Sequence, residues 1–164
     1  MRLSKYIERS HICQSVYNTL MRQSSKSADL ARLFSALADT TRLRLLNLMA
    51  GREVCVCYFV DVLRQSQPKI SRHLAYLRKA GIVAARREGK WMHYRISAPP
   101  DAGPAAGSAP ILAAVLASLR EDKQMQADLA RLHRACCAPQ RLVVPQGAPP
   151  PVLLPSLGGS PLHP

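Results

Sequence analysis

Proline divides this chain into segments that can and cannot form regular structure. Eight of the 13 prolines lie in residues 138–164, and four more, together with two glycines, lie in residues 98–110. Proline has no backbone N–H and a fixed φ, so neither segment can propagate a helix or a central strand. We therefore predict a linker at 98–110 and a disordered tail at 138–164. Regular structure is then expected in residues 28–97 and in one helix at 111–137, behind an N-terminal extension, 1–27, that contains a candidate amphipathic helix.

The charge of the chain indicates an anionic partner. The 164 residues carry a formal net charge of +13, a balance most often associated with nucleic acid or a membrane surface. Residues 28–97 hold +8 of this charge, the preceding extension holds +4, and residues 98–164 hold only +1. The excess therefore coincides with the segment whose apolar periodicity is densest. The length suits one domain of ordinary size with tails.

The five cysteines are not typical of a disulfide framework. No apolar run approaches the ~20 residues of a membrane span, and the charged N-terminus does not resemble a secretion signal. We therefore expect a cytoplasmic protein with no membrane partner, in which thiols stay reduced. An odd count with two close pairs favours metal or metalloid ligands, or redox thiols. The cysteines are Cys13, Cys55, Cys57, Cys136 and Cys137.

The pattern within residues 28–97 predicts a winged helix–turn–helix, mainly α with a small β-hairpin wing. Apolar spacing and an N-cap at Asp39 separate the first two helices. Pro68 suits the first turn of a helix that ends before Gly81. Two β-prone runs around Glu88-Gly89 predict the hairpin. The predicted elements, in order, are helices at 28–39 and 41–50, a short β-prone segment at 53–56, helices at 57–63 and from the turn at 64–67 to about residue 79, and strands at 82–87 and 90–96.

The outward face of the second helix of the turn motif, with the hairpin tip, forms a candidate DNA-binding surface. A recognition helix places its first residues against base edges, where Arg suits guanine and Gln suits adenine. Basic residues on the hairpin suit phosphates or the minor groove. For any single residue a solvated helix face is an equally good interpretation, and His73 suits helix packing or a phosphate as well as a base. The candidates are Gln67, Lys69, Ser71, Arg72, His73, Tyr76, Arg86, Arg87 and Lys90.

Residues 28–96 resemble the ArsR/SmtB family of metal-responsive repressors. The motifs that carry the resemblance are Leu33–Asp39 with Thr41–Leu46, Glu53–Cys57, Ser66–Leu74 and Gly81–Trp91. The resemblance implies a homodimer built on the first and last helices. It also implies repression of a resistance operon through double-stranded operator DNA with an inverted repeat, and release when As(III) or Sb(III) binds. Two departures concern the cysteine box, where Tyr58 replaces a frequent Asp and Val60 replaces a third Cys.

Thiolates suit the soft As(III) ion better than carboxylate or water. Residues i and i+2 share one side of an extended chain but diverge on a helix. If Cys55 and Cys57 grip one ion, we expect the start of the following helix to be extended or distorted. Cys136 and Cys137, from the same or the other subunit, are candidates for a third ligand, and Cys13 is a weaker one. The alternative interpretations are buried small hydrophobes at the box and an incidental pair at the helix end.

Several functions stay open beside the leading hypothesis of a non-enzymatic, arsenic-responsive repressor. A regulator of the same kind could sense zinc, cadmium or thiol oxidation; Asp122 with His133, or His93, would be zinc candidates. A thiol redox enzyme is a different class, but Cys55 has neither a phosphate-binding loop nor an evident general base. A constitutive nucleic-acid-binding protein is a further alternative. A methylated arsenical needs only two thiolates, so the preferred arsenical is also open.

Overall fold

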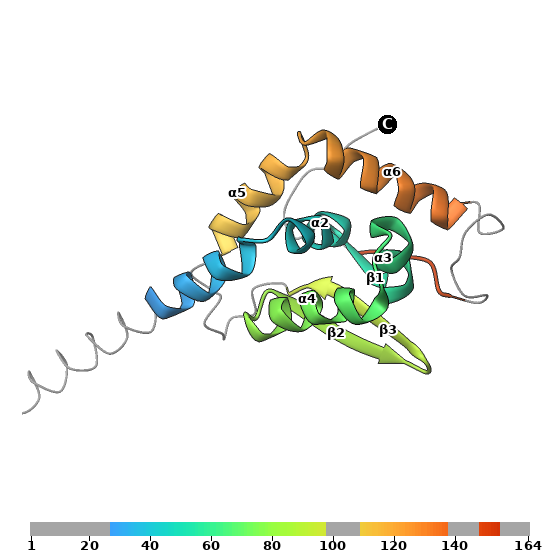
Figure 1. The fold of residues 1–164 in the computed structure, drawn as a ribbon, viewed down its shortest axis with the longest axis horizontal. Coiled ribbons are helices and arrows are strands. Elements are labelled where there is room, and N and C mark those ends of the chain that lie inside the picture. The colour runs from blue at the N-terminus through green and yellow to red at the C-terminus, as the bar shows by residue number, and fades with distance from the viewer. Residues whose placement is uncertain (1–26, 98–108, 138–147, 155–164) are drawn as a thin grey trace, which may run out of the picture.

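The computed structural model describes residues 27–97, 109–137 and 148–154 (Figure 1). Cys13 and the other residues of segment 1–26 lie outside these residues, as does linker segment 98–108. After a helical segment at 27–37, the elements in chain order are α2 (Thr40–Met49), β1 (Arg52–Cys55), α3 (Val56–Leu63), α4 (Gln67–Lys79), β2 (Val83–Glu88), β3 (Trp91–Ile96), α5 (Ala109–Leu119), α6 (Lys123–Cys137) and β4 (Val152–Leu153).

The helix boundaries follow from local chemistry. The Asp39 carboxylate accepts a hydrogen bond from the Arg42 backbone N–H at 2.9 Å and so caps α2, as predicted. Pro68 lies in the first turn of α4, where its missing N–H leaves no helical hydrogen bond unmade. Gly89 has a φ of +57° in the turn between β2 and β3, a conformation that glycine adopts without strain. The order of elements confirms the predicted winged helix–turn–helix.

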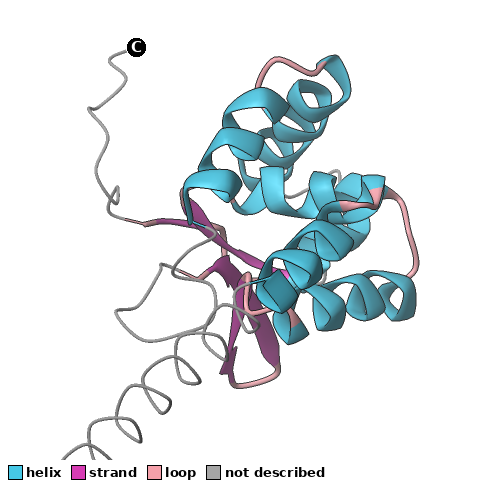
Figure 2. Ribbon diagram, turned by 90° about the vertical axis from the view of Figure 1, so that its left-hand side faces the viewer, coloured by secondary structure: helices cyan, strands magenta, loops and turns pink. Residues whose placement is uncertain are grey.

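The helices gather around one mainly aliphatic core beside a small antiparallel sheet (Figure 2). The strand order is β2-β3-β1-β4, so the hairpin predicted as a wing is joined through β3 to the strand that ends at Cys55. α5 and α6 lie across α2 and α3, on the side away from the hairpin (Figure 1). None of the helices in the described residues is long and apolar enough to cross a membrane. The largest fully buried side chains include Leu45, Leu46, Phe59, Ile70, Leu74 and Leu77.

The single helix predicted at 111–137 is wrong, because the structure has two helices there. α5 begins at Ala109, inside the predicted linker, and ends at Leu119. α6 begins at Lys123, after Asp122 accepts a hydrogen bond from the Met125 N–H at 3.0 Å. This side-chain cap competes with continued helix.

The prediction of a disordered tail fails at residues 148–154. Val152 and Leu153 pair antiparallel with Glu53 and Arg52 at the outer edge of β1. The Leu154 N–H extends this pairing with a 3.0 Å hydrogen bond to the Gly51 carbonyl. An edge strand needs few N–H donors, so a short pair of non-proline residues suffices next to a proline run.

Candidate dithiol site and nucleic-acid interface

Cys55 and Cys57 form a dithiol at the junction between β1 and α3. Cys55 is the N-cap of α3 and has an extended backbone, with φ −70° and ψ 144°. Because the chain is still extended at Cys55, both side chains lie on one side, and the Cys57 thiol donates to the Cys55 sulfur across 3.0 Å. The extended backbone that a shared ion would need is therefore already present before α3 begins.

The geometry divides the two sulfurs into a thiolate and a thiol. The hydrogen bond from Cys57 lowers the pKa of Cys55 to about 6, against the raising effect of burial. The same bond, with burial, raises the pKa of Cys57, because loss of its proton would place two negative charges side by side. At neutral pH the pair therefore shares one proton and holds one thiolate, which is the form that binds soft metals. Cys55 is fully buried and Cys57 is half-buried.

Three further side chains surround the dithiol. His93, the Cα partner of Cys55 on β3, is buried, and neither of its ring nitrogens has a hydrogen-bond partner in the described structure. Its Nδ1 lies 3.8 Å from Oε1 of Glu53. Burial raises the pKa of the adjacent Tyr58 phenol to about 12, and the charges of Cys136, Cys57 and Cys55 add to this effect.

The remaining ligand candidates are placed less closely. Cys136 is half-buried against the core in the last turn of α6. Cys137 ends α6, and its side chain lies outside the described part, as does Cys13. Within residues 27–97, 109–137 and 148–154, no three His, Cys, Asp or Glu side chains are grouped closely enough to hold a metal ion. Asp122, a zinc candidate with His133, is occupied as the cap of α6.

The predicted recognition helix, α4, presents only part of its candidate set to solvent. Gln67, Lys69 and Arg72 are exposed, whereas Ser71 is half-buried. His73 is also half-buried, and its Nδ1 lies 3.3 Å from Oδ1 of Asp39. His73 therefore connects α4 to α2, in line with the helix-packing alternative.

Arg42 is a residue that the sequence analysis missed. Its guanidinium lies 4.5 Å above the Tyr76 ring and donates to the carbonyls of Ala36 at 2.6 Å and Ser35 at 2.8 Å. It thus joins the helical segment 27–37 to α2 and α4. Only its position three residues after a helix cap could have suggested this role.

The three basic residues of the wing have different surroundings. Arg86 is paired with Glu53 at 2.6 Å and with Glu88 at 2.7 Å, so its charge is offset within the protein. Arg87 is exposed and donates to the Gly89 carbonyl at 3.0 Å. Lys90 is exposed, with its Nζ 4.9 Å from the centre of the Trp91 ring. Arg87 and Lys90 are therefore the cations at the tip of the hairpin.

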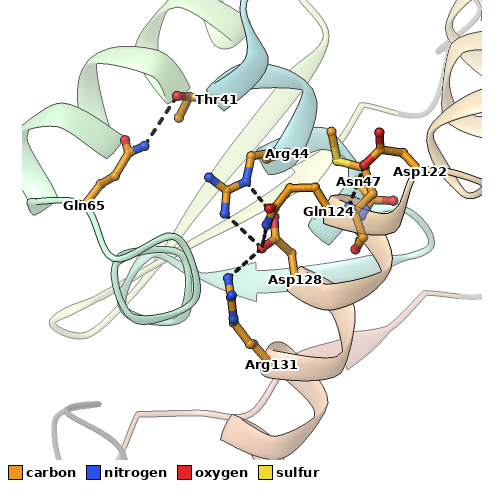
Figure 3. A network of polar contacts seen from close by, with 9 residues as sticks. Thr41, Arg44, Asn47, Gln65, Asp122, Gln124, Asp128 and Arg131 are labelled. Atoms are coloured by element: carbon orange, nitrogen blue, oxygen red, sulfur yellow. Dashed lines mark hydrogen bonds and ion pairs between the residues drawn. The ribbon is translucent and has the colours of Figure 1, made fainter.

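A buried ion pair, which the sequence analysis also missed, connects α6 to α2 (Figure 3). Arg44 donates two hydrogen bonds to the fully buried Asp128 carboxylate, at 2.6 and 2.9 Å. Gln124 and Arg131 donate to the same carboxylate from α6 itself. Nothing local marks this contact, because its partners are 84 residues apart.

Comparison with known proteins places this architecture in a family. Residues 39–85, which contain the dithiol and α4, match the family model described as "Bacterial regulatory protein, arsR family". An uncharacterised HTH-type transcriptional regulator from Methanocaldococcus jannaschii is 51% identical over 67 residues, which cover 40% of this chain and 75% of that protein. The chain belongs to the ArsR family.

Other relatives of this ArsR-family chain carry more specific names. The arsenical resistance operon repressor of Escherichia coli (strain K12) is 54% identical over 67 residues, or 40% of this chain and 57% of that protein. The chain thus spans just over half the length of the first curated relatives that it matches. A solution structure from Mycobacterium bovis, described as a homodimeric winged helix–turn–helix DNA-binding domain, has a TM-score of 0.50 and 30% identity, covering 61% of this chain and 86% of that one.

Proposed function

We propose that this ArsR-family protein is a homodimeric transcriptional repressor of an arsenic-resistance operon, and that As(III) or Sb(III) releases it from its operator by binding Cys55 and Cys57. The observation that carries the proposal is the 3.0 Å contact between the two sulfurs at the first turn of α3. The lowered pKa of Cys55 supports it. The name of the Escherichia coli relative supports the same signal and the same target.

The position of the dithiol supplies a route from the metalloid to DNA. α3 packs directly against α4, the helix that carries the candidate base-reading residues. A trivalent ion that bridges Cys55 and Cys57 replaces their shared proton and changes the conformation of the first turn of α3. Binding and DNA release are then two outcomes of one element with two arrangements.

The DNA interface combines the exposed start of α4 with the hairpin tip. Gln67, Lys69 and Arg72 read base edges in the major groove, with Ser71 beside them. Arg87 and Lys90 contact phosphates or the minor groove, with Arg86 behind them. The charge of +8 on residues 28–97 favours such a surface.

The helices outside this interface supply the dimer contact. α5 is rich in Ile, Leu, Val and Ala, and none of its residues is fully buried within the chain, although Ile111, Leu112 and Leu116 pack partly against the core. Phe34 of the helical segment 27–37 is 54% exposed. Apolar surface of this kind marks an interaction site, and a two-fold dimer suits an inverted-repeat operator in the cytoplasm.

The test is DNA binding with and without a metalloid. A duplex is first selected from a random library with the purified protein, and its affinity is measured by fluorescence anisotropy. We expect arsenite or antimonite to release wild-type protein and the Cys13→Ser control, but not Cys55→Ser or Cys57→Ser. Full release of both box variants would contradict the proposal.

Thiol oxidation is a second candidate signal, favoured by the same sulfur geometry. Hydrogen peroxide would accept two electrons from the pair, together with the Cys57 proton and one proton from solvent, to give a Cys55–Cys57 disulfide and two waters. Release by peroxide under conditions where arsenite has no effect would favour this candidate. Release by zinc or cadmium alone would indicate the other alternative signal.

A further inference from the structure

We propose that Cys136 supplies the third thiolate to As(III) held by Cys55 and Cys57, and that it does so within the same chain. This inference rests on the proposed function and names the part of its site that the cysteine box leaves open. It also assigns the preferred ligand class, an inorganic trivalent ion with three replaceable oxygens.

The end of α6 lies against the helix that begins at the dithiol. α3 and α6 pack together, and Cys57 and Cys136 are both half-buried against the same core. Tyr58, next to Cys57 in the first turn of α3, is buried in the same core that Cys57 and Cys136 pack against.

Arg52 places a cation beside Cys136. It is the first residue of β1, the strand that ends at Cys55. Its Nε is buried and has no hydrogen-bond partner in the described structure. Burial lowers the pKa of the guanidinium and the Cys136 charge opposes that shift, so the two groups are within electrostatic reach.

The path of the chain keeps Cys136 near Cys55 and Cys57 of the same chain. α6 ends at Cys137, and residues 148–154 already lie back on the same sheet. Leu153 pairs with Arg52, and the Leu154 N–H bonds to the Gly51 carbonyl. Arg44 and Asp128 fix α6 about two turns before Cys136. The segments before and after the last turn of α6 are thus both bonded to other elements of the same chain.

The third ligand must move to complete the site. The described side chains contain no preassembled group of three ligands, so binding has to draw the last turn of α6 towards α3. For arsenous acid, three S–As bonds form and three As–O bonds break, and each oxygen leaves as water with a proton from a thiol or, where the cysteine is already a thiolate, from solvent. Phenylarsine oxide forms two S–As bonds and releases one water, so it does not need Cys136.

The experiment measures arsenical binding to the full chain without DNA. The readouts are the near-ultraviolet charge-transfer absorbance of the S–As bond and the number of thiols protected from a thiol reagent. Cys136→Ser is compared with Cys137→Ser, its matched neighbour. We expect Cys136→Ser to weaken arsenite binding at least about tenfold, because even supporting residues of a metal site are worth roughly that much. Phenylarsine oxide should still bind Cys55 and Cys57 in both variants, and circular dichroism verifies that they fold.

A mixed dimer separates one chain from two. Cys57→Ser and Cys136→Ser chains with different tags are co-expressed, and the heterodimer is isolated. If all three thiols come from one chain, neither chain of this heterodimer has a complete site. If the third thiol comes from the other chain, the heterodimer keeps one complete site. Restoration, or unchanged arsenite affinity in Cys136→Ser, would overturn the inference. If arsenite protects only two thiols of the wild-type protein and still releases it from DNA, the role of Cys136 is overturned but the proposed function is not. If the wild-type protein binds no arsenical, the proposed function is overturned as well.

Discussion

Nδ1 of His73 lies 3.3 Å from Oδ1 of Asp39, the same oxygen that caps α2. One carboxylate thus begins α2 and connects it to the recognition helix α4. We expect Asp39→Ala to lower the free energy of unfolding by ~1 kcal/mol, because it removes the cap. Asp39→Ser restores a capping oxygen and should recover most of this loss in urea denaturation followed by circular dichroism. Equal losses in both variants would show that the contact with His73, not the cap, matters.

Because His73 is engaged with Asp39, it should matter less for DNA than Arg72, which is exposed. Arg72→Ala should cost about 1–3 kcal/mol of binding free energy and relax the base preference at one position. His73→Ala should cost less and leave the preference unchanged. The measurement is anisotropy with the selected duplex and single-base variants of it. A larger effect of His73→Ala would place its imidazole on a base.

The wing arginines should separate a stability role from a DNA role. Arg86→Ala leaves the nearly buried Glu53 carboxylate without its 2.6 Å partner, so we expect this variant to lower the unfolding free energy. Arg87→Ala should leave stability unchanged and reduce the salt dependence of DNA binding by about one unit of slope. Titrations at several salt concentrations check this, and the opposite assignment of the two effects would contradict it.

The Arg44–Asp128 pair should be the most sensitive point between α2 and α6. Asp128 is fully buried, so Asp128→Ala leaves the Arg44 charge uncompensated. We expect a loss of about 3–5 kcal/mol of unfolding free energy. Asp29→Ala, which removes an exposed pair with Arg32, is the control and should cost under about 1 kcal/mol. Similar losses of unfolding free energy in both variants, measured at the same protein concentration, would contradict a stabilising role for the buried ion pair.

The dithiol should make stability depend on pH. The pKa of Cys55 is lowered to about 6 from an ordinary 9.0, so between these values the unfolded chain binds more protons than the folded one. Stability therefore rises with pH through this window and is lost as pH falls towards 6. Above it the raised pKa of Cys57 reverses the trend, because the folded pair keeps a proton that the unfolded chain releases. A Cys55→Ser, Cys57→Ser variant should lack this dependence in urea denaturation at each pH, and a wild-type profile that matches the variant would contradict the shared proton.

The fold of residues 28–97 was predictable because each element carries a local signal. Asp39 is a cap, Pro68 suits a first helical turn, and Glu88-Gly89 suits a hairpin turn. The division of α5 from α6 was missed although Asp122 is a local signal, since the apolar stripe runs on both sides of it. The strand at Val152–Leu153 had no such signal, because its hydrogen bonds depend on the free edge of β1.

Local patterns in the chain were enough to predict a winged helix–turn–helix with a basic face and a Cys-X-Cys box, since caps, turns and periodicity act over a few residues. Which side chains meet became evident from the folded chain. It placed the Cys57 thiol 3.0 Å from the Cys55 sulfur, turned His73 towards Asp39, and buried Asp128 against Arg44. The physical reason is that hydrogen bonds and ion pairs depend on distances of a few ångströms between residues far apart in the chain, and packing alone sets those distances.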